Sequence, residues 1–425
     1  RSSPMTEENI SCKVISFLFI SNLFIKGLFC NINKLDEYKG DEYISYICEK
    51  SRIEKSRNMN NPFKFGTIVD AEYFTDRVAE QEKVREILAS ENHLILISPR
   101  RFGKTSLVQK VTKGLSRPVF QLNLQLVTDT ADFAAQLLRI VLQQYPMERL
   151  KHLITHFRFI PTISTNPMTD GIEVSFQPSM DGFILLEDVF TLIDKLGMKN
   201  PHKKPIVVLN EFQEIRTLDK NLDKKLRSIL QTYNHANYIF LGSQESMMQE
   251  IFEKKKSPFY HFGYLMKLGK IPQDDFYEFL KNGFLLLGKD MDAETIGRSI
   301  LSFTNCHPYY TQQLAYQTWN NWKQNGYSDT LVETAITELT HVHDMDYERL
   351  WSTFNKTDKK VLIGLTMQMG TPSSLPFLQG VGIDSPSTAF SSLKRLGQQG
   401  YVIRNEGYEL DDPFFRRWIE VKREG

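Results

Sequence analysis

The chain has 425 residues, more than one ordinary hydrophobic core accommodates, so we expect two or three domains. Hydrophobic residues make up 41% and charged residues 24%, a composition typical of globular domains. A formal net charge of +1 excludes a global attraction to nucleic acid, so any basic surface must be local. The four cysteines lack the paired spacing of zinc sites or disulfide frameworks, which favours a reducing, cytoplasmic location.

Residues 1–58 differ from everything that follows them. An apolar run at 14–29 is interrupted by Asn22 and Lys26, and a polar stretch comes after it. A membrane span needs roughly 20 apolar residues, and a central lysine is costly in a bilayer. We therefore interpret 1–58 as a non-native or disordered leader and expect no membrane partner, with a membrane anchor as the alternative.

Short apolar runs alternate with helical patterns over the next two hundred residues. The runs lie at 94–97, 119–124, 206–209, 238–241 and 264–268, and helical spacing occurs at 105–115, 131–142 and 222–233. This alternation predicts an α/β fold, in which helices cover both faces of the parallel sheet of a P-loop NTPase core at 59–272. The proline-containing stretch 145–180 breaks the rhythm and is expected to be an insertion or a long irregular connection.

The C-terminal third is predicted to be helical. Helical patterns at 275–286, 293–304 and 308–321 indicate a helical lid domain at 273–345. Helices near 356–369 and 387–398, followed by a hairpin at 400–410, predict a winged helix-turn-helix at 346–425. Within it, the helical spacing of Phe390, Leu393 and Leu396 predicts core positions.

A phosphate-binding loop is predicted between the first apolar run and the helix after it. The sequence Ser98-Pro-Arg-Arg-Phe-Gly-Lys-Thr-Ser106 matches that loop at its Gly-Lys-Thr end. Backbone N–H groups there can surround phosphate oxygens, Lys104 can reach the outer phosphates, and the Thr105 hydroxyl can ligate Mg²⁺. Ser98 stands where the usual pattern has glycine. The candidate nucleotide-binding residues of the loop are Ser98, Pro99, Arg100, Arg101, Phe102, Gly103, Lys104, Thr105 and Ser106. The alternative is an ordinary strand-to-helix loop with surface lysines and arginines.

Two further segments carry candidate catalytic groups. The apolar run 206–209 leads into Asn210 and Glu211, where P-loop ATPases place an Asp that orders Mg²⁺ through water and a Glu that activates water. Glu211 is the candidate general base, and Asn210, a candidate metal-site residue without the negative charge, predicts slow turnover. Ser243, after the run 238–241, is a candidate nucleotide sensor, and a helix cap is the alternative for it.

The sequence resembles the archaeal-type ATPase family, a signal-transducing (STAND) branch related to AAA+ proteins. The resemblance covers residues 61–418 and rests on the phosphate-binding loop and on six short motifs. They are Phe74-Thr-Asp-Arg77, Leu209-Asn-Glu-Phe-Gln-Glu214, Gly242-Ser-Gln-Glu-Ser246, Pro258-Phe-Tyr260, Cys306-His-Pro-Tyr-Tyr-Thr-Gln-Gln-Leu314 and Asp412-Pro-Phe-Phe-Arg-Arg-Trp418.

The resemblance implies an ATP-driven switch that uses Mg²⁺. It places Phe74 and Arg77 near the adenine, and His307 and Pro308 where the lid approaches the nucleotide; a helix start is the alternative for Pro308. The choice of ATP rather than GTP follows from the resemblance and not from the chemistry of the loop. Lysines at 254–256 occupy the region where related ATPases carry an arginine finger, which leaves catalysis in a homo-oligomer open.

DNA and an unidentified protein are the other candidate partners. Lys394 and Arg395 on the second predicted helix of the winged domain, with Arg404 in its wing, could contact DNA. Neighbouring acidic residues reduce that positive charge, and winged helices also dock proteins. The leading hypothesis is therefore a slowly hydrolysing ATP-dependent regulatory switch. The rivals are a DNA-binding regulator with a structural ATP site and a scaffold or defence-associated signalling protein that oligomerises.

Overall fold

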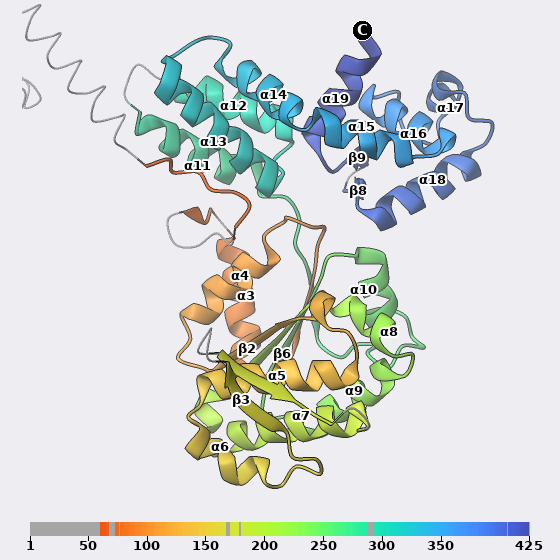
Figure 1. The fold of residues 1–425 in the computed structure, drawn as a ribbon. Coiled ribbons are helices and arrows are strands. Elements are labelled where there is room, and N and C mark those ends of the chain that lie inside the picture. Colours follow the sequence, from red (N-terminus) through yellow and green to blue (C-terminus); the bar gives the residue numbers. More distant parts are fainter. Residues whose placement is uncertain are drawn as a thin grey trace, which may run out of the picture.

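The protein consists of two lobes (Figure 1). The computed structural model describes residues 60–67, 73–75, 77–166, 171–177, 180–287, 292–405 and 407–424. One lobe contains a central sheet with its covering helices, and the other is almost entirely helical. The leader expected at residues 1–58 lies outside the described residues.

A five-stranded parallel sheet forms the centre of the first lobe, as the sequence predicts. Its strand order is β2-β5-β6-β1-β7. The strands are β1 (Leu94–Ile97), β2 (Val119–Asn123), β5 (Ile206–Asn210), β6 (Asn237–Gly242) and β7 (Tyr264–Lys267). The order puts β1 and β6 side by side, with β5 on the other side of β6, so the loops that follow these strands meet at one edge of the sheet.

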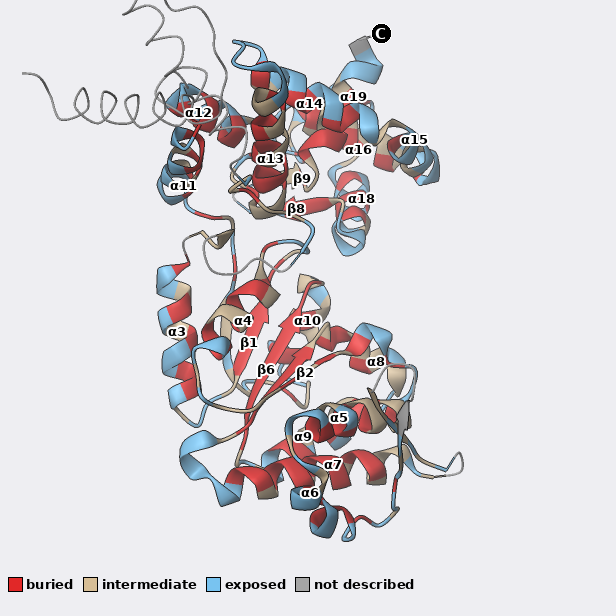
Figure 2. Ribbon diagram, turned by 60° about the vertical axis from the view of Figure 1, so that its left-hand side comes forward, coloured by how far each residue is buried: buried red, intermediate tan, exposed pale blue. Residues whose placement is uncertain are grey.

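The three central strands β1, β5 and β6 are buried on both faces, as expected of a sheet covered on both sides. Along β1, Leu94 and Leu96 pack toward α3 (Val78–Ala89) and α4 (Lys104–Lys113). The alternate residues Ile95 and Ile97 belong to the larger hydrophobic cluster with α5 (Thr130–Gln144) and α7 (Gly182–Lys199). The sheet is consequently buried between two helical layers (Figure 2). The shorter elements of this lobe are η2 (Leu124–Leu126), η3 (Pro201–Lys203), η4 (Phe212–Glu214), α8 (Ile215–Leu218), α9 (Leu222–Thr232) and α10 (Glu245–Phe252).

The stretch 145–180 is an insertion with regular structure. It contains α6 (Met147–Ile154) and an antiparallel hairpin of β3 (Thr162–Asn166) and β4 (Gly171–Ser175). The expectation of an irregular connection is therefore wrong. Pro146 is the N-cap of α6 and Pro161 directly precedes β3, positions at which a missing N–H interrupts no hydrogen-bond ladder.

The second lobe combines the predicted lid and winged helix. The lid helices are α11 (Gln273–Leu285), α12 (Ala293–Thr304), α13 (Pro308–Asn325) and α14 (Leu331–Val342). The winged domain comprises α15 (Asp344–Thr353), α16 (Lys356–Thr366), α17 (Leu375–Val381), α18 (Pro386–Gln399), the hairpin β8 (Val402–Arg404) and β9 (Tyr408–Leu410), and α19 (Pro413–Glu424). One hydrophobic cluster runs through both parts. None of the described helices is long and apolar enough to span a bilayer.

The predicted core face of α18 is only partly buried. Leu393 and Leu396 are buried, whereas Phe390 is 43% exposed and touches Tyr408 at the edge of its ring. The buried face of α18 runs through Ala389, Ser392, Leu393 and Leu396, and Phe390 lies beside that face. The spacing therefore identified two of the three core positions, and Phe390 is an exposed aromatic residue.

The segment 60–67, hereafter the strap, belongs to the second lobe although it precedes the sheet in sequence. Phe63 is 1% exposed and packs against Phe279, Phe284 and Trp319 of the lid. Asn61 donates hydrogen bonds from Nδ2 to the Tyr316 carbonyl (3.0 Å) and to Asn320 Oδ1 (3.1 Å). The strap is thus anchored on α11 and α13.

Truncation of the strap's anchor should destabilise the second lobe. Phe63→Ala removes a fully buried ring and is expected to lower the free energy of unfolding by roughly 3–5 kcal/mol. Chemical denaturation monitored by tryptophan fluorescence would measure this loss. Ile160→Ala, at a residue 72% exposed in the first lobe, is the control and should change stability very little. Equal stability of Phe63→Ala and the wild type would show that the strap is not anchored there.

Candidate functional site

A cavity of about 720 Å³ opens at the carboxyl edge of the sheet, where the two lobes meet. Three parts of the chain line it. The first lobe contributes Arg77, Gln125, Glu211 and the loop residues Arg100, Arg101, Phe102, Gly103, Lys104, Thr105 and Ser106, and Ile271 of the second-lobe cluster also lines the cavity. The strap and the segment after it contribute Lys64, Phe65, Gly66, Thr67, Tyr73, Phe74 and Thr75, and α13 contributes Pro308, Tyr309 and Gln312. The volume and the carboxyl-edge location are those of a small-molecule site in an open α/β sheet.

The loop 98–106 wraps around the N-terminus of α4. Gly103 is the N-cap of this helix with φ 88°, and Arg101 also has a left-handed φ of 64°. Successive loop N–H groups and the helix N-terminus make this a phosphate-binding geometry. Ser98 has no positive φ and instead ends β1, where its N–H donates to the Gly242 carbonyl (3.3 Å). Glycine is consequently not required at position 98, and the departure from the usual pattern is accommodated.

Lys104, the first residue of α4, is buried beneath the loop. Its Nζ donates to the carbonyl oxygens of Ser98 (2.9 Å) and Pro99 (2.9 Å) and to Ser98 Oγ (3.2 Å). Burial lowers the pKa of Lys104 to about 8, and the charges of Glu211 and Glu245 act in the opposite direction. The amine is therefore positioned by the loop carbonyls on the same edge of the sheet as Glu211.

Glu211 and Ser243, from the ends of neighbouring strands, are in direct contact. Glu211 follows β5 with a left-handed φ of 53°, and its carboxylate lines the cavity. Ser243 follows β6 and donates to Glu211 Oε2 from both Oγ (2.6 Å) and the backbone N–H (3.3 Å). The two residues predicted as base and sensor thus form one hydrogen-bonded unit, although Ser243 does not itself line the cavity.

The residues fit a magnesium nucleotide in the positions that the sequence suggests. Thr105 lines the cavity directly after Lys104. Asn210 Oδ1 is buried without a hydrogen-bond partner among the described residues, which leaves one acceptor available to a metal-bound water. Mg²⁺ usually takes only one or two protein ligands and completes its shell with water and phosphate oxygens. The absence of three clustered His, Cys, Asp or Glu side chains in the described part is compatible with such a site.

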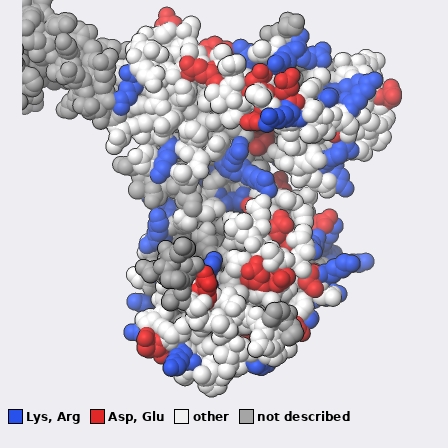
Figure 3. Space-filling view, viewed as in Figure 1, with Lys and Arg blue, Asp and Glu red and all other residues white. Residues whose placement is uncertain are grey.

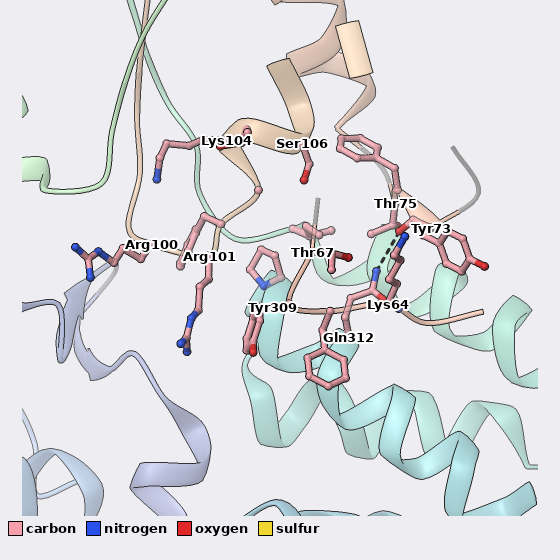
Figure 4. A pocket seen from close by; sticks show the side chains of 18 of the residues that line it. Lys64, Thr67, Tyr73, Thr75, Arg100, Arg101, Lys104, Ser106, Tyr309 and Gln312 are labelled. Carbon is pink, nitrogen blue, oxygen red and sulfur yellow. Dashed lines mark hydrogen bonds between the residues drawn. The ribbon is translucent and has the colours of Figure 1, made fainter. Parts of the chain in front are cut away.

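Two residues of the loop reach out of the first lobe to the lid. Arg101 donates from Nη1 to the Tyr310 hydroxyl (2.8 Å), and its guanidinium lies 4.6 Å from the centre of the Tyr309 ring. Phe102 packs edge-on against His307, with ring centres 4.8 Å apart. In Figure 4, the Arg101 side chain extends away from Ser106 and runs beside Tyr309. Arg101 lines the cavity, but its charged group is bound by the lid.

From the lid these contacts continue into the winged domain. The Tyr310 side chain lies close enough to Asp412, the residue that precedes α19, for the charge of Asp412 to act on it. Asp412 accepts hydrogen bonds from the Tyr347 hydroxyl of α15 (3.0 Å) and from the N–H of Phe414 (2.9 Å). Burial raises the pKa of Asp412, and these hydrogen bonds oppose the rise. A row of polar contacts therefore leads from the phosphate-binding loop through the lid toward the winged domain.

Other contacts support the same junction. His307 is the N-cap of α13, and its Nε2 lies 3.3 Å from Asp411 Oδ1. Pro308 is the first residue of that helix and lines the cavity, so its two predicted roles are compatible. Lys270 pairs with Glu409 of β9 at 2.7 Å. Figure 3 shows lysine and arginine side chains gathered at the level where the lobes meet.

Arg77 and Phe74 lie at the cavity but bind mainly to protein. The Arg77 guanidinium donates to Glu80 Oε1 (2.8 Å) and to the carbonyls of Gly269 (2.6 Å) and Lys270 (3.4 Å). Phe74 packs against the α3–α4 cluster, and Lys110 lies 5.8 Å from its ring centre. These two residues therefore shape the cavity wall, and the charge of Arg77 is bound by protein groups.

Sequence reasoning missed the strap and much of the lid surface. Gln312 Oε1 accepts the Lys64 N–H (3.1 Å), and Gln312 Nε2 donates to the Tyr73 carbonyl (3.2 Å), so one lid side chain links two wall segments. Figure 4 shows Lys64, Tyr73 and Gln312 together on one side of the cavity. The one available signal was the cluster of aromatic residues before α3. Of the predicted binding residues, Ser98, Pro99 and Asn210 lie beneath the cavity rather than in its wall.

The basic residues considered for DNA binding or catalysis differ in their exposure and in their ion pairs. Arg395 forms a two-pronged ion pair with the buried Asp358, so its charge is paired although its side chain is 43% exposed. Lys394 is exposed, and Arg404 is exposed with its guanidinium over Tyr408. The lysines at 254–256 are exposed, and Lys254 pairs with Glu250 at 2.8 Å.

Comparison with solved structures identifies the fold. A Walker-type ATPase of Pyrococcus abyssi superposes with a TM-score of 0.60 at 15% identity, covering 86% of this chain and 99% of that chain. The fold is that of an AAA+-type P-loop ATPase. ORC2 of Aeropyrum pernix, solved as ADPNP-ADP complexes, gives a TM-score of 0.49 at 16% identity over 85% of this chain and 100% of its own. The RuvB branch migration motor of Thermotoga maritima superposes with a TM-score of 0.40 at 14% identity, covering 83% of this chain and 97% of that chain. No protein-family profile and no curated protein sequence matches the chain.

ATP binding should depend on pH through Lys104. The free protein holds the pKa of Lys104 near 8, and phosphate contact favours the charged amine, so the bound pKa is higher and binding takes up a proton above pH 8. The affinity for ATP is expected to be highest and constant below about pH 8, and to fall by up to roughly tenfold per pH unit above it. Calorimetric titration at several pH values would measure this. Lys104→Arg, whose guanidinium stays charged, should remove the dependence, and a pH-independent wild type would contradict it.

Proposed function

We propose that this protein is an ATP-binding, slowly hydrolysing P-loop ATPase that acts as a regulatory switch through its lid and winged helix. The observation that carries the proposal is the contact of the phosphate-binding loop with the second lobe, made by Arg101 and Phe102. A ligand in the cavity would touch both lobes at once, because loop, strap and α13 all line it. Occupancy is therefore coupled to the relative position of the lobes.

The candidate residues divide the chemistry among them. Bound ATP with Mg²⁺ would supply the γ-phosphoryl group and the metal charge that stabilises its transfer to water. Lys104 and the N-terminus of α4 would bind phosphate oxygens, and Thr105 would hold the metal. Glu211 orients the attacking water and accepts its proton, with Ser243 fixing one carboxylate oxygen. Asn210 provides an acceptor without charge, which makes the metal site weak and turnover slow.

Restoring the charge at position 210 should raise turnover. Asn210→Asp is expected to accelerate single-turnover hydrolysis by roughly 10- to 100-fold, because the carboxylate orders the metal shell. Lys104→Ala should lose ATP binding, and Glu211→Gln should keep binding while hydrolysis falls to a small residual rate. Rapid-quench measurements on the full chain with excess protein would give these rates. An unaccelerated Asn210→Asp would exclude the metal role of this position, and a parent protein that binds no ATP would exclude the switch.

The switch should depend on Arg101. In the wild type, ATP with Mg²⁺ is expected to change amide hydrogen exchange at the start of α13 and at residues 411–415, because the loop rearranges around phosphate. Arg101→Ala should bind ATP yet lose the response at 411–415. Arg100→Ala is the matched control, since Arg100 is directed away from Tyr309 (Figure 4). Identical responses in the two variants would show that Arg101 does not transmit the state of the loop.

The rival functions have less support. A DNA-binding regulator would use α18 and the wing, but Arg395 is bound by Asp358, which leaves Lys394 and Arg404 as the exposed cations there. Salt-sensitive DNA binding without ATP turnover would favour that rival. A scaffold that oligomerises would instead show a nucleotide-dependent change in mass without DNA binding.

A further inference from the structure

The carboxylate of Glu211 is held by a second side chain that the assignments above leave without a role. Gln213 lies in the 3-10 turn η4, two residues after Glu211, and its Nε2 donates to Glu211 Oε2 at 2.6 Å. The same oxygen accepts the two hydrogen bonds from Ser243. Three donors therefore converge on Oε2, and the structure gives no hydrogen bond from the described residues to Oε1.

The backbone at Glu211 makes this contact possible. With φ 53°, Glu211 turns the chain sharply from β5 into η4, so the side chain of Gln213 folds back toward the strand end. A non-glycine residue in the left-handed region is under strain, which persists only where the surroundings fix it. The strained turn brings the Gln213 amide and the Glu211 carboxylate together at the wall of the cavity.

Stability alone does not account for Gln213. The residue is 1% exposed, and its Oε1 is buried without a hydrogen-bond partner among the described residues. A buried polar atom left unsatisfied costs about 1–3 kcal/mol, whereas an apolar side chain of the same shape avoids this cost. Methionine would fill the same space. The amide is therefore needed for its N–H donor, and that donor hydrogen-bonds to Glu211.

We propose that Gln213 is a positioning residue that fixes the orientation of Glu211 for hydrolysis. Ser243 approaches Oε2 from the end of β6, and Gln213 approaches it from η4. A carboxylate held from one side can still rotate about its side-chain torsions, while donors from two elements fix its plane. Oε1 is then left to receive the attacking water. This inference rests on the proposed ATPase function of Glu211.

The test replaces the amide while keeping the shape. Gln213→Met in the full chain is expected to slow single-turnover ATP hydrolysis by roughly 10- to 100-fold, as loss of a supporting hydrogen bond does. ATP affinity should stay the same, because Gln213 does not line the cavity, and the unfolding midpoint should not fall. Gln109→Met is the matched control, since Gln109 donates to Gln121 and lies outside the cavity wall.

A double-mutant cycle separates positioning from a structural role. If Gln213 acts through Glu211, Gln213→Met should slow the wild type but cause no further loss in a Glu211→Gln background. An equal loss in both backgrounds, an unchanged rate or a faster rate would each overturn the proposal. Equal hydrolysis by the wild type and Glu211→Gln would instead overturn the function assigned to Glu211, and the role of Gln213 with it. The single Glu211→Gln comparison therefore tells the two failures apart.

Discussion

The parallel order of the three central strands is the constraint on which the site depends. Because β5, β6 and β1 are neighbours that run in one direction, the chain leaves all three at the same edge. Glu211, Ser243 and the loop that begins at Ser98 all lie at that edge. The hydrogen bond from the Ser98 N–H to the Gly242 carbonyl extends the pairing of β1 and β6 by one residue beyond the end of β1. If one of these strands ran in the opposite direction, it would end at the other edge of the sheet, and these groups would not meet.

The first lobe supplies the chemistry but encloses only part of the cavity. The strap and α13 complete the wall, and the strap is anchored through Phe63 in the lid rather than in the sheet lobe. The guanidinium of Arg101 is bound by the lid tyrosines, and the charge of Asp412 acts on it as well. Two lobes that share a binding cavity in this way cannot respond to a ligand independently, which is the physical basis of the proposed switch.

The sequence predicts those parts of the molecule that depend on local pattern. All five sheet strands, the loop at 98–106 and most helices follow from apolar spacing and from the Gly103-Lys104 pair. The contacts of Gln312 with Lys64 and Tyr73 join residues about 240 positions apart, and nothing in the local sequence reports them. The pairing of Arg395 with the buried Asp358 is also absent from the local pattern, so the sequence alone indicates an unpaired cation at position 395.

Arg77 restricts how the two lobes can move relative to each other. The chain enters the sheet lobe just before α3 and leaves it again at residues 269–271, and Arg77 links these two crossings through the Gly269 and Lys270 carbonyls. Two chain segments that are linked side by side act as a hinge that bends easily in one direction. Bending moves both segments together, whereas twisting would pull them apart. Lid motion in this protein is therefore expected to be an opening and closing movement, and rotation of the helical lobe about the long axis of the molecule is resisted.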